Sequence, residues 1–152
     1  MLGKFIYVGS LGLVVAIAGI LCLNYRVVIG PAILTLTIVP ILGLFFAKRP
    51  FQGAIPDMLF GAIDTGILVI PALWGGMVYG VAGAIAGGVI GDALTDGIAG
   101  FFEGGIAEWL RKKGIQESRE PITTSLGKMA GCLFGAGVFL SLASVLGIAP
   151  KF

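Results

Sequence analysis

The sequence predicts an all-α, polytopic integral membrane protein, a bundle of about five transmembrane helices that forms a single domain over residues 1–152. Hydrophobic residues make up 57% of the chain and charged residues 12%, about half the charged fraction of a typical soluble domain. Apolar runs of about 20 residues, the length that crosses a bilayer, alternate with short polar breaks. Basic residues gather at alternate breaks, as expected when those breaks share one side of the membrane.

The first two apolar runs each fit one crossing. Residues 5–23 form the first run, which is longer than the ~7–15 residues of a signal-peptide core, so we expect a retained helix rather than a cleaved leader. Residues 27–47 form the second run, after a polar break at residues 24–26. Pro31 and Pro40 lie inside it, and transmembrane helices tolerate prolines as kinks.

The middle of the chain is too long for one crossing, because no basic residue interrupts residues 58–110. We expect two spans, 58–73 and 77–100, joined by a turn at residues 74–76, with an interfacial extension of the second span to residue 113. The alternative is four full spans plus a re-entrant or interfacial segment. The last span covers residues 121–148, with Pro121 suited to the first helical position.

The distribution of basic residues supports the count of five spans and sets the orientation. One side then collects seven basic residues and the other side two: Lys4, Lys48, Arg49, Arg111, Lys112, Lys113 and Arg119 against Arg26 and Lys151. Such a bias predicts a cell-membrane protein with a cytoplasmic N-terminus. The net charge of +2 gives no electrostatic support for nucleic-acid binding.

Glycine is unusually frequent, with 26 glycines in the chain. Gly83, Gly87 and Gly91 repeat every four residues, a pattern that lets another helix backbone approach closely. This row predicts a helix-packing face. The contact lies either within one chain or between chains, so we expect a homo-oligomer or a membrane partner subunit, with the lipid bilayer as solvent.

Three carboxylates lie in the fourth predicted span and its interfacial extension. Asp92, Asp96 and Glu103 fall within about 40° of one another around a helix, roughly opposite the glycine row. Carboxylates are costly in hydrocarbon and are usually turned towards protein or water. We therefore expect this acidic face to point into the bundle or into a cavity between copies.

The third predicted span carries Asp64, in a stretch (residues 61–67) that resembles residues 92–98. The similarity is either an inverted repeat, as found in small transporters, or chance in a sequence of low complexity. Lys128 in the last span is either an internal counter-ion to these acids or a side chain that reaches back to the headgroups.

Together with Thr65 and Thr95, the four acids offer hard oxygen ligands suited to a proton, Na⁺, Mg²⁺ or Ca²⁺. The leading hypothesis is therefore cation transport or a channel through an acidic intramembrane site, in which the identity of any metal ion stays open. The alternative is a non-catalytic scaffold or accessory subunit that packs through its glycine faces, with the acids as neutral or paired contacts.

The sequence gives little support for an enzyme. Histidine is absent, so the serines have no obvious activating base, and we expect neither catalysis nor a cofactor. Cys22 and Cys132 lie in different apolar runs and are expected to be packing residues without a disulfide.

Overall fold

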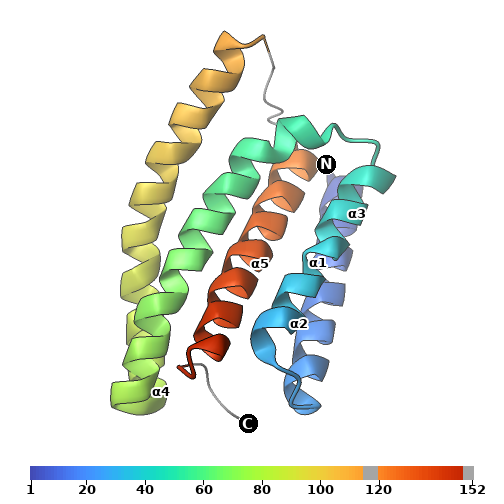
Figure 1. Ribbon diagram of the computed structural model, residues 1–152. Helices are drawn as coiled ribbons and strands as arrows, with labels where there is room; N and C mark the ends of the chain where they lie inside the picture. The colour runs from blue at the N-terminus through green and yellow to red at the C-terminus, as the bar shows by residue number, and fades with distance from the viewer. Residues whose placement is uncertain (115–119, 149–152) are drawn as a thin grey trace.

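The structure is a computed structural model that describes residues 1–114 and 120–148, apart from the side chain of Glu103. These residues form α1 (Leu2–Asn24), α2 (Ile29–Leu36), α3 (Ile38–Phe46), α4 (Phe51–Lys112) and α5 (Pro121–Val145) (Figure 1). Four helical stretches are long and apolar enough to cross a membrane: α1, α2 with α3, α4 and α5. The predicted all-helical class is confirmed.

Helices α2 and α3 together make one broken rod, Ile29–Phe46. The break follows from Pro40, because proline has no N–H with which to bond the carbonyl four residues earlier. Thr37 separates the two helices, and its N–H bonds the Leu34 carbonyl three residues back. The first proline, Pro31, lies in the first turn of α2, where a missing N–H disturbs nothing.

Helix α4 is a hairpin of two helical arms rather than one straight helix. Gly80 has φ +63° and ψ −148°, and it is the residue within α4 whose backbone is not helical. The chain therefore runs the length of the molecule, reverses at Gly80 and returns beside itself (Figure 1). The predicted spans 27–47 and 58–73 left residues 48–57 as a connecting loop. The first arm begins at Phe51, directly after Pro50, so most of this predicted loop is helical.

The reversal at Gly80 corrects the predicted turn at residues 74–76. Gly75 and Gly76 are helical and contact the second arm. A Cβ added at Gly75 would overlap the Gly83 carbonyl, and one at Gly87 would overlap the Pro71 carbonyl. The row of Gly83, Gly87 and Gly91 thus faces the first arm of the same chain.

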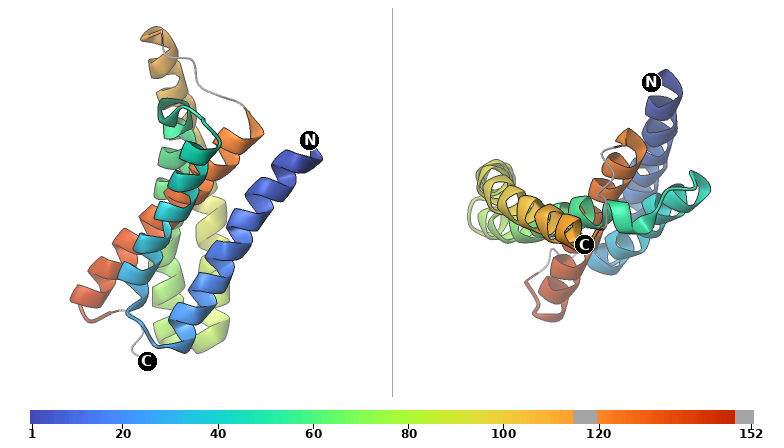
Figure 2. Two further views of the ribbon diagram at one scale, coloured as in Figure 1. Left: turned by 90° about the vertical axis from the view of Figure 1, so that its right-hand side faces the viewer. Right: turned by 90° about the horizontal axis from the view of Figure 1, so that it is seen from above.

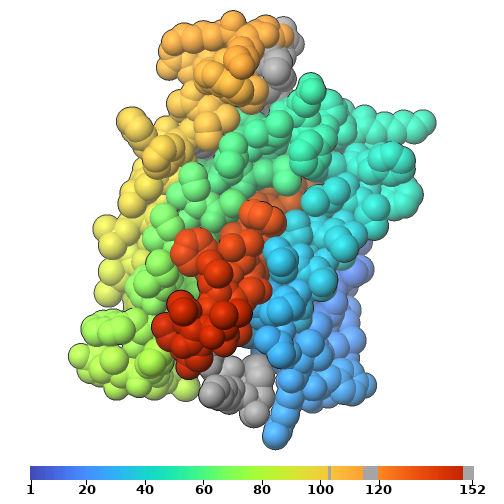
Figure 3. Space-filling view, in the orientation of Figure 1, coloured from blue at the N-terminus to red at the C-terminus, as the bar shows by residue number. Residues whose placement is uncertain are grey.

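Helix α5 lies at the centre of the molecule, between the first arm of α4 and helix α2 (Figures 2 and 3). Glycines permit its contacts on both sides. A Cβ added at Gly131 or Gly135 would overlap the first arm of α4 at Met58 or Ala62. On the α2 side, a Cβ at Gly137 would come 2.6 Å from the Leu34 Cα.

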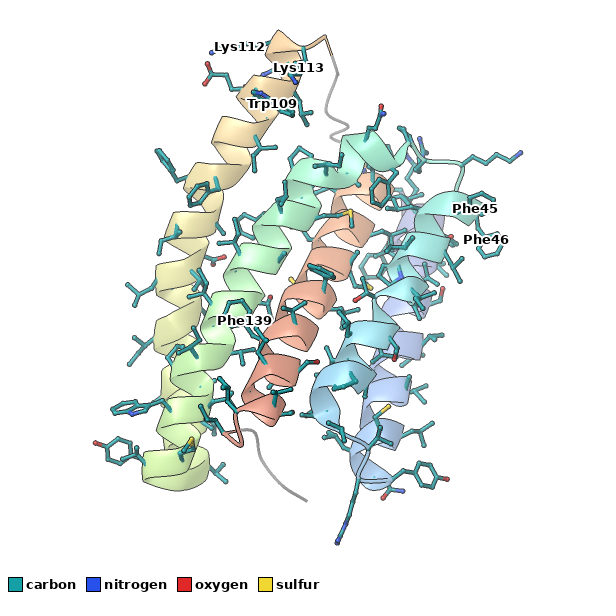
Figure 4. The ribbon with its side chains drawn as sticks, in the orientation of Figure 1. Phe45, Phe46, Trp109, Lys112, Lys113 and Phe139 are labelled. Atoms are coloured by element: carbon teal, nitrogen blue, oxygen red, sulfur yellow. The ribbon has the colours of Figure 1, made fainter. Side chains whose placement is uncertain are left out.

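Apolar side chains of neighbouring helices form two buried clusters along α5. One cluster joins Leu44, Ala54, Ile122 and Leu126 near the start of α5. A second cluster joins Val69, Ala136 and Leu140 near its end, with Phe139 packed against it between α4 and α5 (Figure 4).

Helix α1 is peripheral, and every one of its residues is at least partly exposed. The Tyr7 hydroxyl donates a hydrogen bond of 2.7 Å to the Gly43 carbonyl in α3. A second attachment comes from Lys4, whose ammonium lies 2.7 Å from a Glu120 carboxylate oxygen.

Glu120 joins three parts of the chain at one end of the bundle. Its Oε2 caps α5 by accepting from the N–H groups of Ile122 (3.0 Å) and Thr123 (3.2 Å). Its Oε1 contacts Lys4 of α1 and, at 3.4 Å, Arg49 in the α3–α4 connection. Burial on its own raises the pKa of Glu120, but these hydrogen bonds and positive charges lower it by more, so the pKa lies below the ordinary 4.5.

Replacing Gly80 with alanine tests the hairpin. The dihedral angles at Gly80 belong to a region almost restricted to glycine, so Gly80→Ala should lower the free energy of unfolding by about 1–3 kcal/mol. Gly88→Ala is the matched control, because Gly88 is helical and a Cβ there meets nothing within 4 Å. That control should stay within about 1 kcal/mol of the wild type. Equal unfolding curves for both variants, measured by circular dichroism in mixed micelles, would contradict the assigned reversal.

The Glu120 junction predicts a pH dependence of stability. Because the folded state lowers the pKa of Glu120, the stabilisation is complete above the unfolded value near 4.5 and is lost as pH falls through the lower folded value. Glu120→Gln should cost about 1 kcal/mol at pH 7 and flatten this part of the profile. The comparison is the thermal unfolding of the wild type and Glu120→Gln between pH 7 and pH 3. Parallel stability profiles would show that Glu120 does not cause the pH dependence.

Candidate functional site

The candidate site is centred on a hydrogen bond between the two arms of α4. The Thr95 hydroxyl donates to Asp64 Oδ1 over 2.6 Å. Both side chains are buried, with exposed fractions of 8% for Asp64 and 2% for Thr95. The same hydroxyl lies 3.2 Å from the Asp92 carbonyl one turn earlier, which fixes its position on the helix. A carboxylate in an apolar interior is thereby held by a donor from the opposite arm.

The four-residue spacing of the second arm explains why Thr95 faces Asp64. Gly83, Gly87 and Gly91 face the first arm, and the next two positions in the same row are Thr95 and Ala99, which are both buried. Residues four apart lie on one face of a helix. The row could therefore have been extended from the sequence to find Thr95 as the inward polar residue.

Asp92 and Asp96 each follow a residue of this row, and the structure leaves both exposed. The expectation that they point into the bundle is therefore wrong for a single chain, because the contact row turns the next position outwards. The other part of that expectation was that the acidic face lines a cavity between copies, and the structure of one chain does not test it. Asp96 and Asp92 are still near enough for their charges to act on the Asp64 carboxylate.

Glu103 lies within α4, but its side chain is outside the described part of the structure. Lys128 is half-buried on α5, with its ammonium 4.0 Å from the centre of the Phe60 ring. Its charge also acts on Asp64. Lys128 thus lies beside the Asp64–Thr95 pair.

Two residues at the contact between the first arm of α4 and α5 were not among the predicted site residues. Cys132 was expected to be a packing residue, but its thiol lies within reach of Thr65 and of the charges on Asp64 and Lys128. It is one helical turn after Lys128, so the spacing of four could have indicated a shared face.

Asp57, with an exposed fraction of 3%, is the second such residue. It was assigned to a loop, whereas it lies in the first arm of α4 against Gly127 of α5. Asp57 and Asp64 are seven residues apart, a spacing that puts both on one face of a helix.

The ligands for a hard cation come together only in part. Within the described residues, no three histidine, cysteine, aspartate or glutamate side chains lie close enough to hold a metal ion. Asp64, Thr95, Thr65, Lys128 and Cys132 instead form a polar cluster where the α4 hairpin meets α5. Such a cluster is able to bind and release a proton, or to contribute oxygen ligands to a site completed by other groups.

The chain matches no protein-family model, no curated protein and no solved structure. Functional inference therefore depends on the polar cluster and its surroundings.

Replacing Thr95 tests the link between the arms. Thr95→Val keeps the shape but removes the donor to a buried carboxylate, so the free energy of unfolding should fall by about 1–3 kcal/mol. Thr95→Ser keeps the hydroxyl and should therefore keep most of the wild-type free energy of unfolding. Thr35→Val is the control, since Thr35 is exposed and its hydroxyl donates to the Ala32 carbonyl, three residues back in the same helix. Denaturation in mixed micelles measures the free energy of unfolding of each variant. An equally large decrease for Thr35→Val would show that loss of any threonine hydroxyl has this effect, and would contradict a specific role for Thr95.

Proposed function

We propose that the protein is an integral protein of the cell membrane with five crossings, namely α1, the α2–α3 rod, the two arms of α4, and α5. Each arm of α4 is roughly 45 Å long at 1.5 Å per residue, which exceeds the ~30 Å hydrocarbon core of a bilayer. The reversal at Gly80 supports counting α4 twice. The second arm continues past the core as an interfacial segment that ends at Trp109, Lys112 and Lys113 (Figure 4).

The proposed orientation puts the N-terminus in the cytoplasm. Lys4 and Arg49 meet at Glu120, at the start of α5, and Lys48 directly precedes Arg49. Arg26 follows α1 at the opposite end. Positive charge gathered at one end favours the cytoplasmic side. Arg119 and Lys151, which also entered the predicted charge count, lie outside the described residues.

For this membrane protein we propose the binding or translocation of a proton or small hard cation at Asp64. The observation that carries the proposal is the buried Asp64 carboxylate, held between the α4 arms by Thr95. Ionisable groups inside membrane spans are costly and usually serve a function. Thr95 and Thr65 would supply neighbouring oxygens, and Lys128 would balance charge.

Asp92 and Asp96 would form the entry to this site from the exposed side of the second arm. Two carboxylates in an apolar segment need protein or water around them. We therefore propose that the protein works as an oligomer or with a partner subunit that covers this face. Glu103 belongs to the same proposal by its sequence position alone.

One observation favours the scaffold alternative. Gly97, Gly100 and Gly104 on the second arm have nothing within 4 Å of an added Cβ, so a partner helix could approach there closely. In contrast, Gly87 contacts Pro71 of its own chain. The scaffold hypothesis is therefore tested at Gly100, since a larger residue at Gly87 would disturb the fold itself.

Ion flux into proteoliposomes tests the proposed function. Asp64→Asn should reduce proton or Na⁺ flux to the level of empty liposomes, because it removes the charge at the centre of the site. Asp92→Asn and Asp96→Asn should reduce flux in part. Glu108→Gln is the matched control, since Glu108 is exposed and pairs with Lys112 at the end of α4.

The scaffold hypothesis expects different sensitivities. Gly100→Leu should then reduce the number of chains per particle, counted by single-molecule photobleaching, whereas Asp64→Asn leaves that number unchanged. Wild-type flux no greater than that of empty liposomes, with every tested cation, would remove the transport proposal.

A further inference from the structure

A groove runs between the first turns of α1 and α5, which lie side by side at one end of the molecule (Figure 2). It encloses about 600 Å³. Its walls are apolar and come from both helices, with Leu2, Phe5 and Val8 on α1 and Pro121 on α5. Gly9 lines the floor, and a Cβ added there would meet nothing within 4 Å.

Among the described lining residues of the groove, Lys4 has the one charged side chain. Its ammonium lies 2.7 Å from Glu120 Oε1, and Arg49 reaches the same oxygen at 3.4 Å. Among the described residues, two positive side chains thus contact one carboxylate, which leaves an excess of one positive charge in this group. Lys4 keeps 43% of its side chain exposed, so it is accessible to a further anion.

Two other grooves beside α5 differ in this respect. One lies between Ile41, Met58 and Phe134, and the other between Ile70, Trp74 and Leu146. The described residues that line them include no charged side chain. The groove at Lys4 is therefore amphiphilic in a way that these two are not.

We propose that the α1–α5 groove binds one acyl chain of an anionic phospholipid, whose phosphate lies at Lys4. The groove opens on the apolar outer surface of α1, where lipid is the solvent. A partner helix fits less well, because a helix about 10 Å wide fills 600 Å³ with roughly one and a half turns. Positive charge near the headgroups favours an anionic lipid over a zwitterionic one.

Native mass spectrometry of the full chain in micelles tests the proposal, with phosphatidylglycerol and phosphatidylcholine as probes. The wild type should retain phosphatidylglycerol in preference to phosphatidylcholine. Gly9→Leu fills the groove and should weaken phosphatidylglycerol retention by roughly tenfold, as expected when a few methylenes lose their site. Gly19→Leu is the matched control: Gly19 is also in α1 with nothing within 4 Å, but it does not line the groove.

The headgroup contact has its own pair of variants. Lys4→Gln should weaken phosphatidylglycerol retention by about fivefold and leave phosphatidylcholine unchanged. Arg26→Gln makes the same charge change at the other end of α1 and should have no effect. Excess inorganic phosphate should not displace the lipid, because the acyl chain supplies most of the binding.

Three outcomes would overturn the proposal: equal losses for Gly9→Leu and Gly19→Leu, equal retention of both lipids by the wild type, or displacement by inorganic phosphate alone. A dimer that dissociates on Gly9→Leu would assign the groove to a second copy of the chain and would also overturn it. None of these outcomes bears on ion flux at Asp64, so the two proposals can fail separately.

Discussion

Close contact between helix backbones, made possible by glycine, is the constraint on which this structure depends. Helices surrounded by lipid gain nothing from hiding apolar side chains from one another, so packing depends on dispersion and close approach. Gly75 against Gly83 sets the distance between the arms of α4, and Gly131 against Met58 sets the distance from α4 to α5. A side chain at either position would push the backbones apart along the full length of the contact.

The same contacts determine where polar groups lie. The second arm meets the first through every fourth residue, so Thr95 faces inwards. Asp92 and Asp96 each come directly after a residue of this row and therefore face outwards. Asp64 is then enclosed by a donor rather than by other carboxylates. One chain therefore contains a buried acid with a small polar cluster, and two exposed carboxylates on the outer face of the second arm.

The periphery of the molecule has a different character. Helix α5 is held on two sides by glycine contacts, whereas α1 is attached through the Tyr7 hydrogen bond, the Lys4–Glu120 ion pair and side chains such as Leu11 that pack against the core. That loose attachment leaves the apolar groove beside Lys4 open to the surrounding medium. The polar cluster joins α5 to the two arms of α4, whereas the groove joins the start of α5 to α1, so the two features lie in different parts of the molecule.

The sequence by itself determined the all-helical class and the approximate extent of most helices. Hydropathy, prolines and polar breaks are properties of the chain in one dimension, and they indicated α1, the α2–α3 rod and the start of α5 at Pro121. The residues of the site were partly foreseen: Asp64 and Thr95 were candidates, whereas Cys132 and Asp57 were assigned to packing and to a loop.

The tertiary structure decided the rest, because it depends on which face of each helix meets a neighbour. Sequence spacing gives the angles between residues of one helix, such as Asp92 and Asp96 with the glycine row, but not the direction in which that helix is turned. The sequence also has many glycines near the middle of α4, any of which could allow a reversal. In the register that the structure shows, Gly75 contacts Gly83, and the reversal between them lies at Gly80. The outward position of Asp92 and Asp96 and the burial of Asp57 follow from that register and from the contact with α5.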